Sequence, residues 1–532
     1  MKITHKLLTL KTFFILITLA IFLNACGGGG TKDNNSVFIP KSASIAAVVD
    51  LKQISSKSTQ WRAVFEPEFL EQFDIELDEE EVEGMIKLVQ KIMPTISQDD
   101  KISVFNGKVT KDRSKNHFAI AFTITDVDGF EKALQSDKGI KILSEKGAKH
   151  VFLDEKAILH WKGKSGLYVG YEFKIENPQQ TLKKKVADIR STSASDALEK
   201  NNKNFSALLR EEHDIAIWTN QQETRNLTPA VEMYSKMSPT VANLVKANQY
   251  GTSYIDFKPG KMVINGRAFL DEKLTAQYKP VLKVNNDKII KNMPIENPLL
   301  LLSLSINMAD VKKILDEENA YDKFDANTLE QLKNLNLTPK DVAEMLSGDV
   351  VVALESVAIK GLQKIDSKAV VGLGLNNREV FEKFLSQYTK GSVPLLFKKG
   401  NIYEPLIAPW GVDLKIIVTD DAAFIVTTDN LKEAITASKK ALLNSELMKM
   451  TGESNFLTYV SPNDIYNSVP KGTLGNDDLL GALFPLVESV IINTLPAKND
   501  LLEGNITINF KDKKKNALEQ LLGAYKKQKP AN

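Results

Sequence analysis

Hydrophobic positions in this chain follow two different periods, which predict a mixture of strands and helices. Short apolar runs of strand length include Phe118–Thr123 and the pair Leu414–Val418 and Ala422–Val426, which a polar turn separates. Apolar residues spaced three and four apart predict helices over Val82–Met93 and Leu480–Thr494. Because strands and helices do not alternate steadily, we expect an α+β fold with largely antiparallel sheets.

Strand-like runs repeatedly end in a polar residue that can cap a helix, with Asp, Glu or Gln three positions later. These pairs are Asp50 with Gln53, Thr125 with Asp128, Asn177 with Gln180, Asn220 with Glu223, Asn307 with Asp310, Asn376 with Glu379, Asn430 with Glu433, and Ser461 with Asp464. Pro178 and Pro462 are expected at first helical positions, where a missing N–H costs least. We therefore interpret these polar residues as structural caps.

The caps occur four times in each half of the chain, in the same order and at a nearly constant offset. Local sequence agrees, since Gly129–Leu134 matches Val380–Leu385 in kind. This pattern predicts an internal duplication into two tandem related halves, residues 37–290 and 291–532. The boundary is placed in the proline-containing segment 280–297.

The N-terminus has the charge order of a secretory signal. Lys2, Lys6 and Lys11 precede the apolar stretch Thr12–Leu23, and Cys26, the single cysteine, follows it. As a helix the stretch would span roughly 18 Å, which is short of the roughly 30 Å core of a bilayer. The sequence therefore predicts a signal segment rather than a permanent membrane span.

The run Leu23-Asn24-Ala25-Cys26 resembles the lipobox of bacterial lipoproteins. That resemblance implies lipidation of the Cys26 thiol, removal of residues 1–25 as a signal peptide, and attachment to a membrane through the lipid. Residues 26–36, rich in glycine and polar side chains, are expected to form a flexible tether. Several acyl chains would make the attachment stable.

Composition excludes several classes of protein. The 69 basic and 67 acidic residues nearly cancel to a net charge of +2, and 43% of residues are hydrophobic. Such a chain is neither a polybasic nucleic-acid binder nor a disordered acidic protein, so no nucleic-acid partner is expected. Lysine clusters such as 183–185 and 513–515 are interpreted as solvated faces.

Histidine could contribute a site only in the first half, because the second half has none. A hairpin that pairs Leu153 with Ala157 would place His150 directly opposite His160. Two imidazoles are too few for a structural or catalytic zinc site, so we interpret the pair as cross-strand packing. Whether His150 and His160 form any site stays open.

Other candidate motifs are interpreted structurally. Gly163-Lys164-Ser165 lacks the preceding glycine of a phosphate loop and predicts a turn, while Asp126–Gly129 is too short for a calcium loop and starts a helix. Trp161 and Trp218 are expected in the core, and Trp410 in a loop. The sequence predicts no catalytic, cofactor-binding or metal-ligating residue, although it leaves open a dispersed pair of carboxylates.

The start of the folded part, Phe38–Leu51, contains Ile39-Pro40-Lys41-Ser42-Ala43 followed by an apolar strand and a capped helix. It resembles a family of Bacteroidetes envelope lipoproteins built on a domain of unknown function, in which an "I-P-x-x-A" start leads into such a strand. The resemblance implies an outer-membrane location and transfers no catalytic residues. Gly27–Gly30 stand where surface-exported relatives often carry acidic residues, so the periplasmic and the cell-surface face both stay open.

Three functions follow as hypotheses. The first is a non-enzymatic outer-membrane lipoprotein that binds or scaffolds an envelope protein partner and needs no cofactor. The second is a ligand-binding protein that uses a cleft between the two halves. The third is a hydrolase with a dispersed carboxylate pair.

Overall fold

The computed structural model describes residues 35–59, 88–107, 112, 115–137, 139–171, 173–220, 248–272, 275–276, 279–282, 287–317, 321, 325–359, 365–389, 395–407, 412–437, 443–468, 479–498 and 501–528. The signal segment, Cys26 and nearly all of the tether lie outside these residues. By its contacts the chain divides into unit 1, Met1–Asp271 with Asp512–Asn532, and unit 2, Glu272–Lys511. No helix in the described ranges is long and apolar enough to cross a bilayer.

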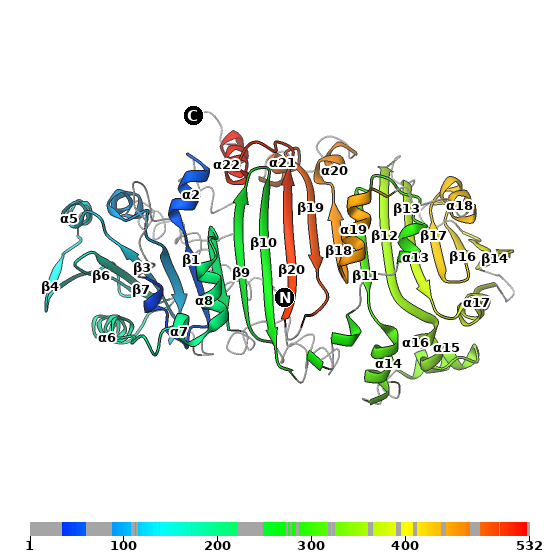
Figure 1. Ribbon diagram of the computed structural model, residues 1–532, viewed down its shortest axis with the longest axis horizontal. Helices are drawn as coiled ribbons and strands as arrows, with labels where there is room; N and C mark the ends of the chain where they lie inside the picture. Colours follow the sequence, from blue (N-terminus) through cyan, green and yellow to red (C-terminus); the bar gives the residue numbers. More distant parts are fainter. Residues whose placement is uncertain are drawn as a thin grey trace. The chain divides into compact units, whose positions relative to one another are not determined.

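Unit 1 is built on an antiparallel sheet whose spatial order is β4-β5-β6-β7-β3-β2-β1-β8-β9-β10 (Figure 1). The strands are β1 (Ile45–Val49), β2 (Ile102–Asn106), β3 (His117–Thr123), β4 (Leu143–Glu145), β5 (Ala148–Phe152), β6 (Ala157–Lys162), β7 (Ser165–Tyr171), β8 (Ile215–Thr219), β9 (Asn248–Lys258) and β10 (Lys261–Leu270). The helices are η2 (Ser36–Phe38), α2 (Leu51–Lys57), η4 (Met93–Thr95), α5 (Val127–Gln135), α6 (Pro178–Arg190), α7 (Leu198–Asn201), α8 (Lys203–Arg210) and α22 (Ala517–Gln528).

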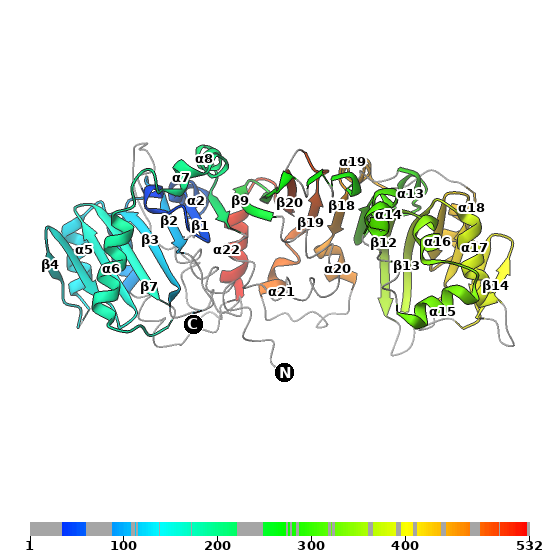
Figure 2. The ribbon, with the colours of Figure 1, turned by 90° about the horizontal axis from the view of Figure 1, so that it is seen from below.

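Helices cover both faces of the central strands of unit 1. On one face α6, α7 and α8 pack on Ala46, Phe105, Ala119 and Leu167 in a single buried cluster. Figure 2 shows α7 and α8 together beside β1 and β2. On the other face α5 contributes Phe130, whose ring packs against rings from β3 and β6. Burial on both faces explains why β1 is a continuous apolar run instead of an alternating one.

Unit 2 is built on an antiparallel sheet in the order β14-β15-β16-β17-β13-β12-β11-β18-β19-β20. The strands are β11 (Leu300–Ser305), β12 (Leu346–Ile359), β13 (Ile365–Leu375), β14 (Leu396–Lys399), β15 (Ile402–Pro405), β16 (Lys415–Val418), β17 (Ala422–Val426), β18 (Phe456–Val460), β19 (Val487–Thr494) and β20 (Leu501–Phe510). The helices are η7 (Lys279–Val281), α13 (Asp287–Lys291), α14 (Met308–Glu317), α15 (Ala326–Asn334), α16 (Pro339–Met345), α17 (Arg378–Ser386), η9 (Gln387–Thr389), α18 (Asp429–Thr436), α19 (Ser445–Glu453), α20 (Pro462–Ser468) and α21 (Leu479–Leu483).

The core of unit 2 also has two layers of helices. Helices α13, α18 and α19 pack on one face of the sheet around Leu301, Val351 and Phe424. Helices α16 and α17 pack on strand residues of a separate buried cluster that includes Phe381 and Tyr403. Helices and antiparallel strands together confirm the α+β fold class.

Two of the expected helix caps form as the sequence predicted. Asp50 accepts a hydrogen bond from the Gln53 backbone N–H at 3.1 Å, and the Asn307 side chain accepts from the N–H two residues later at 3.2 Å. Ser461 directly precedes α20, but its hydroxyl donates to the Asp464 carboxylate at 2.6 Å instead of accepting from a backbone N–H. Helices α6 and α20 both begin at a proline, as expected.

Elsewhere the expected caps are wrong in detail. The capping residues are Asp126 instead of Thr125, Asn377 instead of Asn376, and Thr428 instead of Asn430. Asn177 precedes α6 in a left-handed conformation, with φ of 46°, and makes no side-chain cap bond. A cap needs extended backbone just outside the first turn, and the sequence pattern locates that position only within one or two residues. The helix expected after Asn220 lies outside the described residues.

The helix predicted over Leu480–Thr494 is wrong. Only α21 is helical there, and Val487–Thr494 forms β19, which pairs with β18 on one side and β20 on the other. Its β-branched run Val490-Ile491-Ile492 suits a pleated strand, and pairing on two sides overrides a helical spacing of apolar residues. Of the helix predicted over Val82–Met93, residues 88–92 are helical and 82–87 lie outside the described residues.

Segment 280–297, chosen as the boundary between the halves, is part of a core. It contains α13, and Ile289, Ile290, Met293 and Ile295 are buried in unit 2. The contacts instead divide the chain between residues 271 and 272, and they assign residues 512–532 to unit 1. Helix α22 accordingly packs on β9 and β10. A linear cut cannot describe a unit that takes its last helix from the far end of the chain.

Candidate functional site

The candidate site is built on the hairpin of β5 and β6 in unit 1. The predicted register is confirmed: the Leu153 N–H donates to the Ala157 carbonyl at 3.1 Å, and His150 lies directly opposite His160. Alternation along β6 places Ile158, His160 and Lys162 on one face of the sheet. Two imidazoles and one lysine therefore share a face with an apolar residue.

Helix α6 packs over this face of the hairpin. Its residues Leu182, Val186 and Ile189 are buried against the sheet. Lys183 and Arg190 are seven residues apart, so they lie two turns apart along nearly the same side of the helix. The amphipathic pattern that fixes α6 on the sheet thus also brings these two cations over the histidines.

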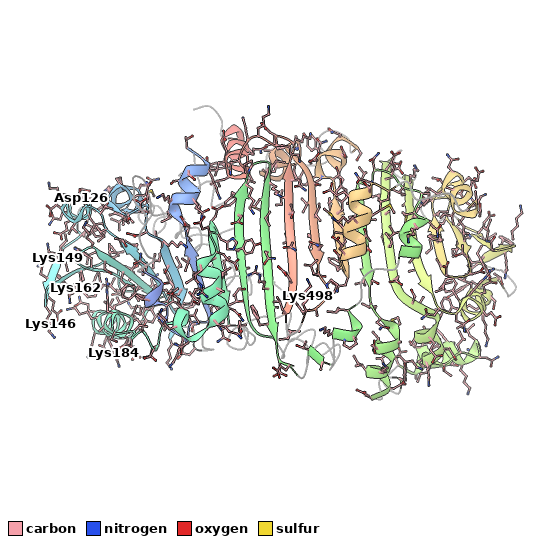
Figure 3. The ribbon with its side chains drawn as sticks, in the orientation of Figure 1. Asp126, Lys146, Lys149, Lys162, Lys184 and Lys498 are labelled. Carbon is pink, nitrogen blue, oxygen red and sulfur yellow. The ribbon has the colours of Figure 1, made fainter. Side chains whose placement is uncertain are left out.

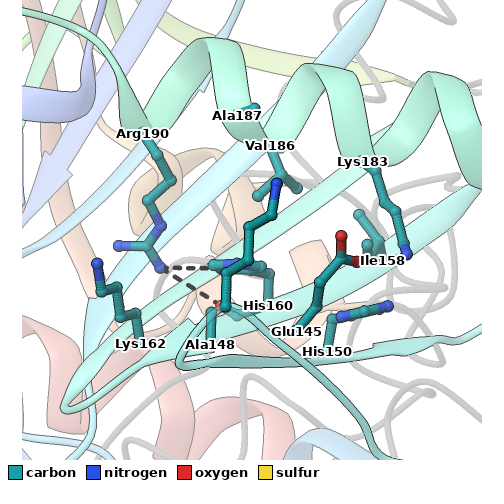
Figure 4. Close-up of a pocket in the computed structure, with 11 residues that line it drawn as sticks. Glu145, Ala148, His150, Ile158, His160, Lys162, Lys183, Val186, Ala187 and Arg190 are labelled. Atoms are coloured by element: carbon teal, nitrogen blue, oxygen red, sulfur yellow. Dashed lines mark hydrogen bonds and ion pairs between the residues drawn. The ribbon is translucent and has the colours of Figure 1, made fainter.

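A pocket of about 410 Å³ lies between α6 and strands β4, β5 and β6 (Figure 4). Its volume falls in the range of small-molecule sites. The lining residues are Glu145, Lys146, Ala148, His150, Ile158, His160, Lys162, Lys183, Val186, Ala187 and Arg190. Four of these side chains are cationic and one is a carboxylate.

Lysines gather around this part of unit 1 more widely. Lys146, Lys149 and Lys162 lie around the β4–β6 end, with Lys184 on α6 nearby (Figure 3). Lys149 is compensated by Glu131, whose carboxylate it contacts at 2.7 Å.

Arg190 is a partly buried cation whose hydrogen bonds all go to neutral groups. Among the described residues its guanidinium donates to the Ser165 hydroxyl and to the Ser165 carbonyl at 2.8 Å. It also lies 3.5 Å from both the carbonyl oxygen and Nδ1 of His160. The Nε atom is buried without a partner in this part of the chain, and burial lowers the pKa of Arg190 to about 10. An inward cation without a countercharge is costly, and a bound anion would relieve that cost.

Lys183 differs from Arg190 because it already has a carboxylate partner. Its ammonium lies 2.7 Å from Glu145 on β4, with 43% and 51% of the two side chains exposed. A hydrogen bond to Lys183 and its charge lower the pKa of Glu145. The ion pair joins the edge strand to α6 at the open side of the pocket.

Both pocket histidines are uncharged at neutral pH. Burial and the nearby Arg190 lower the pKa of His160 to about 4. Burial and Lys183 lower the pKa of His150, although Glu145 opposes the shift. His150 is 4% exposed, and its Nε2 has no partner within the described ranges. Each neutral ring can offer one N–H donor to a ligand without adding charge.

These groups suit the binding of an anion to donors on an apolar wall. Arg190, Lys162 and Lys183 supply cationic donors, while Ala148 and Ala187 supply accessible apolar surface. The described lining side chains include no hydroxyl or thiol and only one carboxylate. Within the described ranges no group of three or more His, Cys, Asp or Glu side chains is arranged to hold a metal ion.

The corresponding position in unit 2 is apolar. His160 pairs with Leu167 on β7, and in unit 2 Ile417 pairs with Phe424 on β17. Ile402 is the cross-strand partner of Ile417, as His150 is of His160. The pocket chemistry therefore belongs to unit 1, in agreement with the absence of histidine from the second half.

Several other expectations are confirmed by the structure. Gly163 lies in the turn between β6 and β7 with φ of 55°, and Asp126 starts α5. Trp161 and Trp218 are 2% and 3% exposed, as expected for core residues. Trp410 lies outside the described residues, as does Trp61.

A second polar cluster in unit 1 surrounds His213. Its Nε2 lies 2.8 Å from Glu211, its Nδ1 lies 3.2 Å from Asp256, and its ring stacks on Tyr254 at 3.7 Å. Burial alone lowers the pKa of His213, but hydrogen bonds to Asp256 and Glu211 outweigh burial and raise the pKa above its ordinary value. We interpret this cluster as structural, since both imidazole nitrogens are already hydrogen-bonded to carboxylates.

His213→Gln is expected to remove a pH-dependent part of the stability, on the order of 1 kcal/mol. Because the folded-state pKa is raised, the contribution of His213 is complete below its ordinary pKa of about 6.5 and is lost as pH rises through the folded-state pKa. Urea unfolding at a series of pH values should show wild type and variant converging as the pH rises. A gap that widened toward alkaline pH would contradict the assignment.

The pocket residues contributed by α6 were missed by sequence reasoning. Lysines 183–185 were interpreted as a solvated face; Lys183 and Lys184 are both exposed, but Lys183 also lines the pocket. The sequence feature that could have indicated them is the pair Lys183 and Arg190, seven residues apart on one side of a helix, with Val186 and Ala187 between them. This spacing indicates a pocket only once α6 is known to pack on the histidine hairpin.

Comparisons with known proteins add little to this picture. No family model matches the chain, and no curated protein matches it. Crystal form IV of TP0453 aligns with a TM-score of 0.26 at 8% identity, covering 45% of this chain and 81% of that chain. Crystal forms I and III each give 0.28 at 9% identity, covering 48% and 88%. Similarities of this size carry no argument about fold or function.

Proposed function

We propose that this protein is a non-enzymatic, lipid-anchored envelope protein that binds a small anionic ligand in the pocket of unit 1. The ligand-binding hypothesis drawn from the sequence used a cleft between the halves, whereas this pocket lies within one unit. The pocket lining contains a single carboxylate, Glu145, and it is paired with Lys183. This site therefore gives no support to a hydrolase that uses two carboxylates.

The observation that carries this proposal is the uncompensated charge of Arg190. Exposed arginines need no carboxylate partner, because water solvates them. Arg190 instead lines a pocket, has a buried Nε without a partner, and bonds only to neutral oxygen and nitrogen atoms in the described chain. A carboxylate or phosphate group would supply the missing charge and accept from a guanidinium with good geometry.

The test is equilibrium binding of two probes, octanoate and inorganic phosphate, to the mature protein by titration calorimetry. We expect saturable binding of at least one probe, weakened about tenfold or more in Arg190→Gln, since charge-assisted hydrogen bonds contribute about 1.5–3 kcal/mol. Lys184→Gln is the matched control on the same helix and should bind as wild type does. Failure of the wild-type protein to bind either probe would refute the proposal.

The anchoring part of the proposal rests on sequence. The lipobox ending at Cys26 supports attachment to the outer membrane through lipid, and both faces of that membrane stay open. The likeness to Bacteroidetes envelope lipoproteins supports the same location.

A scaffolding role with an envelope protein partner is the second candidate. It is favoured by large apolar side chains exposed at the β14–β15 end of unit 2: Ile407 is 76% exposed, Leu395 58% and Phe397 50%. The Leu395 N–H donates to the Tyr388 carbonyl, and the Leu406 N–H donates to the Leu395 carbonyl. These bonds hold the chain at Leu395 beside the chain at Tyr388 and at Leu406. Failure of a pull-down from solubilised membranes to recover a reproducible partner would count against this role.

We also infer that the two units arose by duplication. Both sheets have ten strands in the same spatial order among the described residues, which supports a common origin. Phe130 on α5 and Phe381 on α17 are both buried, and the next residue, Glu131 or Glu382, binds a lysine and a ring donor in each unit. Crystal structures of the units that failed to superimpose strand for strand would contradict this inference.

A further inference from the structure

If the pocket binds an anion, as proposed above, the distance between the two cations on α6 indicates which kind of anion it binds. We infer that the pocket takes an elongated dianion, with one anionic group at Arg190, a second at Lys183 and a short apolar body between them. The Glu145 carboxylate occupies the second position when the ligand is absent, and the ligand exchanges with it.

The two cationic positions are too far apart for one small anion. Lys183 and Arg190 are seven residues apart on a straight helix, so their Cα atoms are separated by roughly 10 Å. Figure 4 shows Arg190 beside His160 and Lys162, and Lys183 beside Glu145 and His150. Each end therefore pairs a cationic side chain with a neutral imidazole.

The wall between the two ends is apolar. Val186 and Ala187 occupy the helix between the two cations, and Ile158 and Ala148 face them from the strands. Val186 and Ile158 are already buried, at 4% and 0% exposure, whereas Ala187 is exposed and Ala148 is partly exposed. A ligand body that crosses this stretch would cover the two alanines, so a hydrocarbon linker fits it better than a polar one.

The two cations at the ends of the pocket differ in whether a carboxylate already neutralises them. Lys183 contacts the Glu145 carboxylate at 2.7 Å, whereas Arg190 has only neutral partners among the described residues. A ligand carboxylate that replaced Glu145 would leave Lys183 paired both before and after binding. The released Glu145 lies on the short edge strand β4 with half of its side chain exposed, so water can solvate it. The ion pair thus acts as an exchangeable closure of the pocket.

The experiment is a chain-length series of α,ω-dicarboxylates, succinate, adipate and suberate, with octanoate as the one-ended probe, titrated into the full mature protein. We expect affinity to rise along the series, and suberate to bind several-fold more tightly than octanoate. The gain is smaller than the roughly tenfold of a new charge-assisted contact, because the second carboxylate replaces Glu145 at Lys183.

Substitutions of Glu145 and Lys183 test whether the ligand displaces the Glu145 carboxylate or is only attracted by the charge of Lys183. Glu145→Gln removes the competing carboxylate and is expected to raise the affinity for suberate several-fold. Lys183→Gln is expected to abolish the preference for suberate over octanoate, measured as the ratio of the two affinities within that variant. Lys184→Gln, one residue along the same helix, should leave all affinities unchanged.

The outcomes distinguish this inference from the proposed function. If octanoate binds as tightly as suberate and Glu145→Gln gains nothing, the two-ended ligand is refuted while an anion site at Arg190 stands. If neither dicarboxylates, octanoate nor phosphate bind, the proposed function itself fails. A loss of suberate affinity in Glu145→Gln would show that Glu145 holds the ligand, and would overturn the exchange.

Discussion

Replacing Phe130 with alanine is expected to lower the free energy of unfolding by about 3–5 kcal/mol, which is a large part of the stability of an ordinary domain. Phe130 is fully buried on α5, and its ring lies 5.3 Å edge-on from Trp161 and 6.3 Å from Phe122. Truncation removes these contacts and leaves a cavity between α5 and the sheet, which rigid strands can fill only partly. Urea unfolding followed by tryptophan fluorescence measures the change.

Phe397→Ala is the matched control for Phe130→Ala. Phe397 is 50% exposed on β14, so the same truncation removes little buried surface and should change stability by no more than about 0.5 kcal/mol. Equal losses in both variants would contradict the assignment of Phe130 to the core.

Cys26→Ser is expected to abolish lipidation completely and to leave an uncleaved precursor. A serine hydroxyl does not replace the thiolate as the nucleophile that accepts the lipid, and the lipobox resemblance implies that cleavage follows lipidation. Metabolic labelling with a radioactive fatty acid, together with the mobility of the protein on gels, measures both effects.

The control for the anchor is Thr31→Ser, a similar exchange in the tether that leaves the lipobox intact. It should be labelled and processed as wild type is. Equal labelling of Cys26→Ser would show that the lipid, if present, is attached elsewhere, and the proposed membrane address would be withdrawn.

Local patterns predicted those parts of the fold that depend on nearby residues. The hairpins Ala148–Leu159 and Leu414–Val426 have the expected partners because a short polar turn and alternating side chains leave one favourable register. The helix predicted for the second half of Leu480–Thr494 was wrong because this segment depends on distant residues. Its strand exists because β18 and β20 lie on both sides of it, and these partners come from other parts of the chain.

The candidate site was half visible in the sequence. The pairing of His150 with His160 followed from hairpin register; both rings are neutral, with His150 buried and His160 partly buried. What the hairpin could not show is Arg190, which lies 30 residues further along the chain from His160 and reaches it at 3.5 Å only because α6 folds back over β6. Long-range packing converts an ordinary lysine- and arginine-bearing helix into one wall of a pocket.

The sequence by itself determined the α+β class, the register of the histidine hairpin and most helix starts to within one or two residues, because each depends on residues within a few positions of one another. The lipid address stays a prediction from the sequence. The tertiary structure decided which segments share a sheet, that the last helix belongs to the first unit, and that four cations meet one carboxylate around a pocket. Burial and distance between remote residues set the cost of an uncompensated charge, and neither is a property of any local stretch of chain.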